Sequence, residues 1–303
     1  MVSRTMGRRA RRVGAGATTL ALVALGAQVG LSPSGAASRP HASGTVDVLY
    51  AGSLLELMQR SLAPAFHRAT GYSVSGFPNG SNALASEIKG ETQAADVFIS
   101  ASPGVNDSLA GKGNGDWLST YSAFGDSPLV LGYNPASRFA RELRAEPWYD
   151  VVGRAGFHLG RTDPATDPKG VLAVDALEGV ALSYDRPRLD ALATATADVF
   201  PETALVGELQ AGQLDAGFFY AVEASAAHLR TVPLVGTALS ATYTVARLNR
   251  APHPAAARAF VRFLLGPVGR RLLRANGITP IVPARSVVVR GSTTTSGPAT
   301  PTT

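Results

Sequence analysis

The chain has 303 residues, of which 45% are hydrophobic and 17% charged, and its formal net charge is +6 at pH 7. This length and hydrophobic content suffice for one large domain or two ordinary ones with packed cores, and they exclude a wholly disordered chain. The sequence has no cysteine, which excludes disulfide scaffolds, thiolate metal sites, cysteine nucleophiles and a bacterial lipoprotein anchor.

The positive charge is concentrated at the N-terminus. Five of the 28 Lys and Arg residues precede an apolar run over 13–31, and small residues follow it at 35–37. This order is typical of a secretory signal peptide, predicted here over 1–37. The remaining 23 Lys and Arg residues nearly balance the 22 Asp and Glu residues, so the charge does not point to nucleic acid as a partner. We expect a secreted or periplasmic protein. The alternative is association with the membrane through an uncleaved signal, because the run is near the ~20 residues of a spanning helix.

From residue 45 onward, short apolar runs alternate with helical patterns. The predicted strands are 46–50, 72–77 and 97–100, and the predicted helices are 54–69 and 82–89. This βαβαβ order predicts a mostly parallel sheet with helices on both faces. Pro64 lacks a backbone donor and is expected to bend the last turn of the first helix.

A second alternation follows. Strands are predicted over 129–133, 157–160, 216–220 and 241–248, helices over 170–178 and 202–211, and one long helix over 254–275, with an apolar stretch at 232–235. The pattern predicts two α/β lobes between which the chain crosses more than once. Lobe I is expected over 45–125 plus 236–290 and lobe II over 126–235, with hinges near 124–127 and 232–236. Residues 291–303 read as a disordered tail.

The loops that follow strands carry the candidate binding residues, because ligands in such sheets bind at the carboxyl ends of strands. Ser53 and Ser81 each follow a glycine directly after a predicted strand, and Lys169 and Glu202 stand where later helices open. Helix starts present unpaired N–H groups and the positive end of the helix dipole. Several of them around one cleft form a receptor for a small anion. The alternative is that both serines are ordinary helix caps. Two Gly-Ser turns at neighbouring parallel strands favour the anion site.

Catalytic and metal-binding patterns are sparse. The five histidines have no metal-ligand spacing, and no nucleophile elbow or phosphate-binding loop occurs. We therefore predict no catalytic residue, no metal site and no cofactor. Asp163 and Asp167 each precede a proline in a turn, where aspartate is favoured for local hydrogen bonds. Tyr220 ends a predicted strand and is either a core residue or a donor at the mouth of the cleft.

An ordered set of short stretches resembles the periplasmic molybdate-binding proteins of ABC transporters. The likeness covers nearly all of 46–281, and its stretches are 49–54, 62–71, 80–85, 95–101, 127–131, 160–164, 205–211 and 214–220. The resemblance implies a two-lobe periplasmic-binding-protein fold of type II with the ligand in the cleft between the lobes. It also implies a non-enzymatic function: capture of molybdate or tungstate for import through an ABC permease. The ligand is then a small inorganic oxyanion, and we expect a monomer.

The same resemblance implies how the oxyanion is held. In that family two serine hydroxyls, a tyrosine hydroxyl and backbone amides bind it, which here correspond to Ser53, Ser81 and Tyr220, with N–H groups near Lys169 and near Glu202. Thr203 is a possible additional ligand.

Two further stretches, 160–168 and 208–215, are similar to an archaeal-type tungstate and molybdate branch. That branch adds two carboxylates to the metal. Asp167 falls where one of them would be, but Phe219 occupies the place of the other. The sequence therefore predicts a tetrahedral anion held by hydrogen bonds.

Two other functions stay open at this stage. A receptor for sulfate, phosphate or a small organic anion would use the same loops, and a protonated phosphate could find its acceptor in Asp163 or Asp167. A secreted hydrolase could use Ser53 or Ser81 as nucleophile. Such a serine needs a base within about 3 Å. The nearest histidine along the chain, His67, lies more than three helical turns after Ser53.

Overall fold

A computed structural model describes residues 43–289, which belong to one compact unit. The predicted signal peptide over 1–37 and the predicted tail over 291–303 lie outside the described residues. Among the helices that the structure describes, none has the length and apolar character needed to cross a bilayer.

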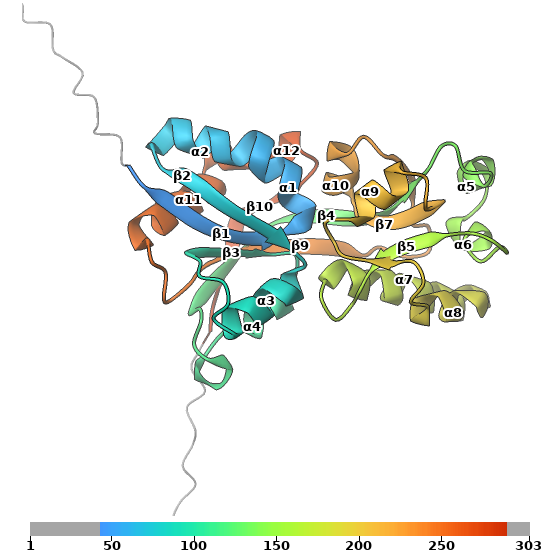
Figure 1. Ribbon diagram of the computed structural model, residues 1–303, viewed down its shortest axis with the longest axis horizontal. Coiled ribbons are helices and arrows are strands. Elements are labelled where there is room, and N and C mark those ends of the chain that lie inside the picture. Colours follow the sequence, from blue (N-terminus) through green and yellow to red (C-terminus); the bar gives the residue numbers. More distant parts are fainter. Residues whose placement is uncertain (1–42, 290–303) are drawn as a thin grey trace, which may run out of the picture. The chain divides into compact units, whose positions relative to one another are not determined.

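The first lobe is built on three parallel strands. β1 (Thr45–Ala51) lies between β2 (Ser73–Asn79) and β3 (Val97–Ser100). Helix α3 (Ser81–Lys89) follows β2, and α4 (Pro103–Asp107) follows β3. Both lie on one face of the sheet, opposite the helix that follows β1 (Figure 1). These three strands and α3 confirm the prediction for this part of the chain.

The helix after β1 changes its winding along its length. It runs as a 3₁₀ turn η1 (Gly52–Leu54), α1 (Leu55–Leu57), a π-helical turn η2 (Met58–Leu62) and α2 (Ala63–Thr70). The wide turn comes directly before Pro64, and the Ala63 N–H bonds the Met58 carbonyl five residues back. Proline lacks the N–H that an α-helix would use there, which gives a physical reason for the local widening.

The centre of the structure is antiparallel. β9 (Ser240–Arg247) pairs with β3 and with β4 (Thr120–Tyr133), and β10 (Thr279–Val288) pairs with the first part of β4. The prediction of a mostly parallel sheet is therefore wrong for these pairings. β9 follows the second lobe in the sequence and returns to the first lobe from the opposite direction.

The second lobe repeats the α/β arrangement. β7 (Ala216–Tyr220) pairs in parallel with β5 (Leu159–Thr162), which pairs with β6 (Val199–Phe200), and β8 (Arg230–Pro233) pairs with β4. Helices α7 and α8 cover one face, and α9 and α10 the other (Figure 1). The helices of this lobe are α5 (Ala140–Ala145), α6 (Trp148–Val151), α7 (Pro168–Tyr184), α8 (Arg188–Thr194), α9 (Leu205–Gln210) and α10 (Ala221–Ala226).

Three predicted helices have different bounds. The single helix predicted over 254–275 is wrong: Gly266 is extended and separates α11 (Pro254–Leu265) from α12 (Pro267–Ala275). Pro267 begins the second helix, a position where its missing N–H costs nothing. Helix α7 extends past the predicted end at 178, and α9 begins at Leu205, so Glu202 lies in the turn before it.

Strand β4 is the only strand that joins the two lobes among the described residues. Its residues up to Pro128 pair with β9, and those from Leu129 onward pair with β7. The chain returns between the end of β8 and the start of β9. The predicted lobe boundaries and hinges stay predictions, and these two crossings of the chain are consistent with them.

Aromatic packing joins the first lobe's helices. Phe66 of α2 is fully buried, and its ring centroid lies 5.2 Å from that of Phe260 and 5.5 Å from that of Phe263, both on α11. Helices from opposite ends of the sequence therefore share one hydrophobic core.

We expect Phe66→Ala to lower the free energy of unfolding by about 3–5 kcal/mol, because the vacated ring would leave a cavity between α2 and α11. Urea denaturation measures the loss. Phe77→Ala is the matched control, since the Phe77 side chain is 41% exposed and should change stability by about 1 kcal/mol or less. Equal losses in both variants would contradict this account of the core.

Candidate functional site

The two predicted serines lie side by side at one end of the first lobe. Ser53 is in η1, directly after β1, and Ser81 is the first residue of α3, directly after β2. β1 and β2 are in parallel register up to their last pair, Ala51 and Asn79. The turns that follow both strands therefore start from the same edge, and both serines are buried there.

Neither serine acts as a helix cap in the described structure. Ser53 Oγ and Tyr243 OH share a hydrogen bond of 2.9 Å. Ser81 Oγ accepts a hydrogen bond of 3.1 Å from the Ala101 N–H, which leaves the Ser81 proton free for another acceptor. These contacts disfavour the interpretation of both serines as ordinary caps.

The second lobe brings a buried lysine and its carboxylates to the same place. Lys169 lies in the first turn of α7 and is fully buried. Its Nζ donates to both oxygens of Glu223 at 2.8 Å and to Glu202 Oε1 at 3.3 Å. Asp167 is the N-cap of α7 and accepts from the Lys169 backbone N–H at 3.2 Å. The resemblance assigned N–H groups near Lys169 to the anion, and the N–H of Lys169 itself bonds the cap of its own helix.

The lobes touch each other around this cluster. The Ala83 N–H donates to the Thr166 carbonyl at 3.0 Å, and Asn82 Nδ2 donates to the Pro164 carbonyl at 3.2 Å. A Cβ on Gly52 would collide with Glu202 Oε2, and a Cβ on Gly80 with the Thr166 carbonyl. Glycine at these two positions therefore permits the close approach.

Three buried polar atoms of the site have no hydrogen-bond partner in the described part of the chain. They are Asp167 Oδ2, Glu202 Oε2 and the Tyr220 hydroxyl. Buried polar atoms nearly always have partners, so a local group of exceptions needs an explanation. A bound polar ligand would supply it. The Tyr220 ring lies 6.1 Å from that of Tyr243, the partner of Ser53, which connects this group to the serines.

Burial sets the protonation of the site. It raises the pKa of Glu202 to about 8, although Lys169 opposes the change, and it raises the pKa of Asp167 and of Glu223. Burial alone would lower the pKa of Lys169, but Glu223, Glu202 and Asp167 together raise it. The lysine is therefore charged. Burial also raises the pKa of Tyr220, so its hydroxyl keeps its proton as a donor.

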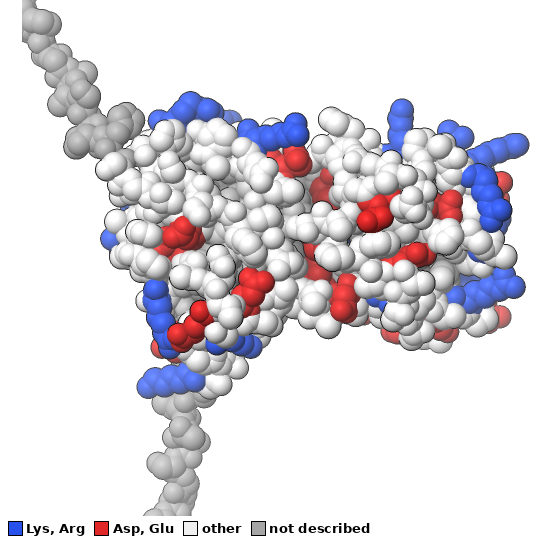
Figure 2. All heavy atoms as spheres, in the orientation of Figure 1, with Lys and Arg blue, Asp and Glu red and all other residues white. Residues whose placement is uncertain are grey.

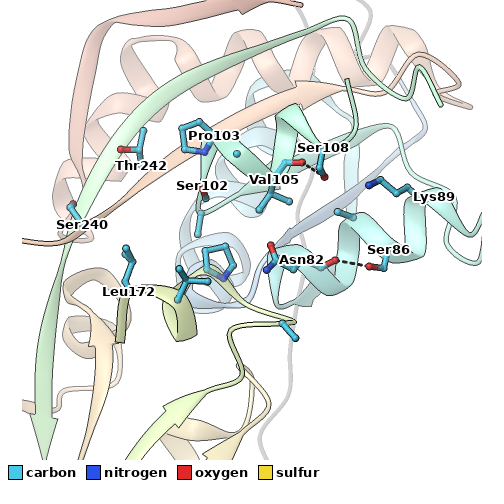
Figure 3. A pocket seen from close by; sticks show the side chains of 16 residues that line it. Asn82, Ser86, Lys89, Ser102, Pro103, Val105, Ser108, Leu172, Ser240 and Thr242 are labelled. Atoms are coloured by element: carbon cyan, nitrogen blue, oxygen red, sulfur yellow. Dashed lines mark hydrogen bonds between the residues drawn. The ribbon is translucent and has the colours of Figure 1, made fainter. Parts of the chain in front are cut away.

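Two open grooves flank the buried cluster. One, of about 520 Å³, is lined by Asn82 of α3, Ser102, Leu172 of α7 and Thr242 of β9 (Figure 3). The other, of about 410 Å³, is lined by Ser53, Glu202 and Thr203 together with residues of η2 and α10. The site thus lies between two approaches from solvent.

The charge on the face in Figure 2 is unevenly distributed. Acidic side chains lie along the middle, where the lobes meet, and most Lys and Arg side chains lie toward the outer ends.

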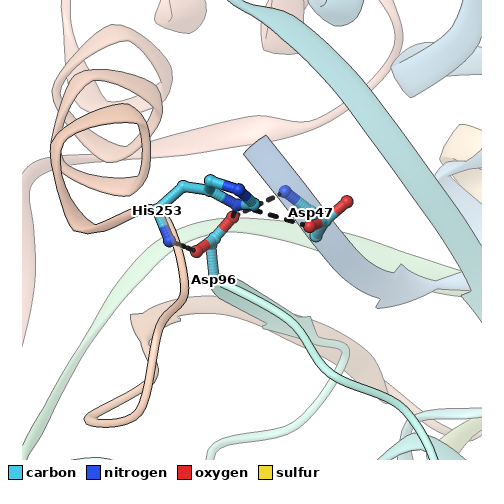
Figure 4. Close-up of side chains that lie close together, drawn as sticks. All are labelled: Asp47, Asp96 and His253. Atoms are coloured by element: carbon cyan, nitrogen blue, oxygen red, sulfur yellow. Dashed lines mark hydrogen bonds and ion pairs between the residues drawn. The ribbon is translucent and has the colours of Figure 1, made fainter. Parts of the chain in front are cut away.

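A second acidic group, Asp47, Asp96 and His253, lies elsewhere in the first lobe (Figure 4). Asp96 is buried, and its carboxylate accepts from the backbone N–H groups of Asp47 and His253 and contacts His253 Nδ1 at 3.0 Å. Asp96 lies just before β3, and its hydrogen bonds connect this strand to β1 and to the N-cap of α11. Asp47, Asp96 and His253 therefore have a structural role.

Glu223 and Tyr243 are parts of the site that the sequence did not predict, and the side chains of Lys169 and Glu202 take part where only nearby backbone N–H groups were expected. Thr203 lines the second groove beside Gly52. No local pattern marks Glu223, because its partner Lys169 precedes it by 54 residues. The signal that could have drawn attention to it was a glutamate directly after the apolar strand that ends at Tyr220.

Comparison with known proteins agrees with this architecture. The family model described as "Bacterial extracellular solute-binding protein" matches residues 46–279. A Haloferax volcanii protein named as an ABC transporter molybdenum-binding protein is 32% identical over 62% of this chain, and the match spans 58% of that protein's length. The molybdate/tungstate-binding protein WtpA of Pyrococcus abyssi is 24% identical over 52% of this chain and 60% of its own. The periplasmic molybdate-binding protein of Azotobacter vinelandii has the same fold, with a TM-score of 0.59 and 19% identity over 77% of this chain and 98% of that one.

We expect Lys169→Met to destabilise the protein by about 3–5 kcal/mol, because it leaves buried carboxylates without their counter-charge. The loss should be smaller near pH 5 than near pH 8, since protonation removes the uncompensated charge. Urea denaturation at both pH values tests this. Lys89→Met, at an exposed position of α3, is the control and should cost less than about 0.5 kcal/mol. A loss for Lys169→Met that does not vary with pH would contradict the assignment.

Proposed function

We infer the function from two facts: the chain belongs to the bacterial extracellular solute-binding proteins, and a buried polar site lies between its lobes. We propose that it captures molybdate or tungstate outside the cytoplasmic membrane and delivers the anion to an ABC permease. In this proposal the oxyanion is the transported ligand, and no cofactor takes part.

The observation that carries the proposal is the group of buried hydrogen-bond donors between the lobes. Ser81 keeps a free proton, and the Tyr220 hydroxyl has no partner among the described residues. Ser53 and Tyr243 share one hydrogen bond in which either hydroxyl can be the donor, so one of the two protons is free for an acceptor. A tetrahedral oxyanion offers four oxygens that accept hydrogen bonds and needs donors from several directions. In a dry site such donors to a charged acceptor are about twice as strong as neutral ones.

The names of the relatives support the choice of anion. One protein of the comparison is named as molybdenum-binding and another as molybdate/tungstate-binding. The matches to the two named relatives cover about three fifths of their lengths. The substrate, the permease partner and the monomeric state are therefore proposed for this chain.

Contacts between the lobes support closure around the anion. The Ala83 and Asn82 hydrogen bonds to the loop 164–166 exist only when the lobes meet. We propose that the lobes separate near 124–127 and 232–236 to admit the anion, and that the bound anion favours the closed form because it contacts both lobes.

A second oxyanion class has one specific observation in its favour. Asp167 Oδ2 is a buried acceptor without a partner in the described structure. Hydrogenphosphate carries a proton that such an oxygen could accept, whereas molybdate carries none near neutral pH. By contrast, the hydrolase alternative has no support, since the described hydrogen bonds of Ser53 and Ser81 go to Tyr243 and Ala101 and not to a histidine.

We expect molybdate and tungstate to raise the melting temperature of the protein, the tighter ligand more at equal concentration, because a ligand that binds the folded state stabilises it by mass action. A thermal-shift series with molybdate, tungstate, sulfate and phosphate tests this. A shift with phosphate alone would favour the second class. If none of the four anions raised the melting temperature, this would contradict the proposed function.

We expect Ser53→Ala and Ser81→Ala together to weaken molybdate binding by about 1–3 kcal/mol for each hydroxyl. Tyr220→Phe should weaken it similarly. The Tyr220→Phe variant should change the stability of the free protein by less than about 0.5 kcal/mol, since the Tyr220 hydroxyl has no partner to lose. Calorimetric titration gives the affinities, and Ser86→Ala, exposed on the same helix as Ser81, is the control. Unchanged affinity in the double variant would exclude this site.

A further inference from the structure

The cluster around Lys169 contains more acidic than basic groups, which is unexpected in a site proposed to bind a dianion. Lys169 is the one cation that contacts Glu202 among the described residues, and it faces three carboxyl groups, those of Asp167, Glu202 and Glu223. Both oxygens of Glu223 accept from Lys169 at 2.8 Å, so this pair is electrically balanced. Asp167 and Glu202 remain without a counter-charge of their own.

Glu202 is the carboxyl group placed between the lobes. Its Oε1 accepts from Lys169 at 3.3 Å, while its Oε2 lies against the Gly52 backbone, next to Ser53 of the other lobe, and has no partner in the described structure. If Glu202 were ionised, an unpaired negative oxygen would lie beside the proposed anion. Two like charges in a dry site repel strongly, whereas a protonated carboxyl can donate a hydrogen bond.

We propose that Glu202 carries a proton when the oxyanion is bound and donates it in a hydrogen bond from Oε2. At a pH where the free protein has lost this proton, capture of the dianion is then coupled to uptake of a proton. The proposal deepens the proposed function and rests on it. The proton comes from solvent, the carboxylate becomes a carboxylic acid, and no other bond is made or broken. Glu202 thus acts as a binding residue whose protonation follows the ligand.

The surroundings of Glu202 act on its protonation in both directions: burial, Glu223 and Asp167 favour the protonated form, whereas Lys169 favours the ionised form. Lys169 and Asp167 face Glu202 from α7 and Glu223 from α10, and the tyrosine hydroxyls of β1, β7 and β9 lie nearby as neutral groups (Tyr50, Tyr220 and Tyr243). The groove outside adds residues at its rim, namely Glu56, Arg60 and His228. Within this setting burial raises the pKa of Glu202 to about 8, and a second negative charge beside it raises the pKa further.

Proton uptake has a defined signature. Below about pH 7 the free protein already holds the proton, and affinity should not depend on pH. Above about pH 8 the free protein must gain the proton on binding, and affinity should fall by up to about tenfold per pH unit. Calorimetric titration with molybdate between about pH 6.5 and 9, in two buffers of different ionisation enthalpy, measures both the affinity and the number of protons taken up.

We expect wild type to take up close to one proton per anion at the upper end of this range, and Glu202→Gln to bind molybdate with no pH dependence. Glu56→Gln is the matched control, because Glu56 lies on the rim of the same groove in an ion pair with Arg60; it should keep the wild-type pH dependence. Should Glu202→Gln fail to fold, the proton count of wild type decides alone.

The two proposals fail differently. Absence of molybdate binding at about pH 6.5 would overturn the proposed function. Binding with a constant affinity and no proton uptake up to about pH 9 would leave that function standing and overturn the role of Glu202. Retention of the pH dependence by Glu202→Gln would also overturn it and would assign the proton to another group.

Discussion

The contact between Lys169 and Glu223 is the interaction on which the site depends. It is buried and joins the first turn of α7 to α10, while the longer contact to Glu202 adds the turn before α9. A buried charge without a partner costs several kcal/mol, so these three segments must keep their spacing in the folded state. The positions of Asp167 and Tyr220, which lie at the starts of the same helices, follow from this constraint.

The first lobe faces the Lys169 cluster of the second lobe with uncharged groups. Its contribution consists of two serine hydroxyls at the ends of parallel strands and of two glycines, Gly52 and Gly80, that let the second lobe approach. Any side chain at these glycines would meet Glu202 or the Thr166 carbonyl. The site is therefore complete only when the lobes meet, and β4 is the one strand whose pairing spans both of them in the described structure.

The sequence reveals local patterns of strands and helices, but it does not reveal contacts between residues far apart in the chain. β1, β2 and β3 alternate with helices, and neighbouring parallel strands end at one edge, so the meeting of Ser53 and Ser81 could be predicted. Pairing partners distant in sequence leave no periodic signal. The hydrogen bond between Ser53 and Tyr243 joins residues 190 apart, and the antiparallel pairing of β9 depends on the return of the chain from the second lobe. Only the folded structure brings such groups together.

The position of the acids bears on how an oxyanion is held. Phe219 stands where the archaeal-type resemblance places a second carboxylate, and it packs with Leu205 and Leu209, while its neighbour Tyr220 belongs to the main core. Successive strand residues face opposite sides, so a side chain at 219 and the Tyr220 hydroxyl point in different directions. The carboxyl groups that reach the site come instead from helix starts and turns, and two of them accept from Lys169. In the described structure these acids therefore balance a buried cation.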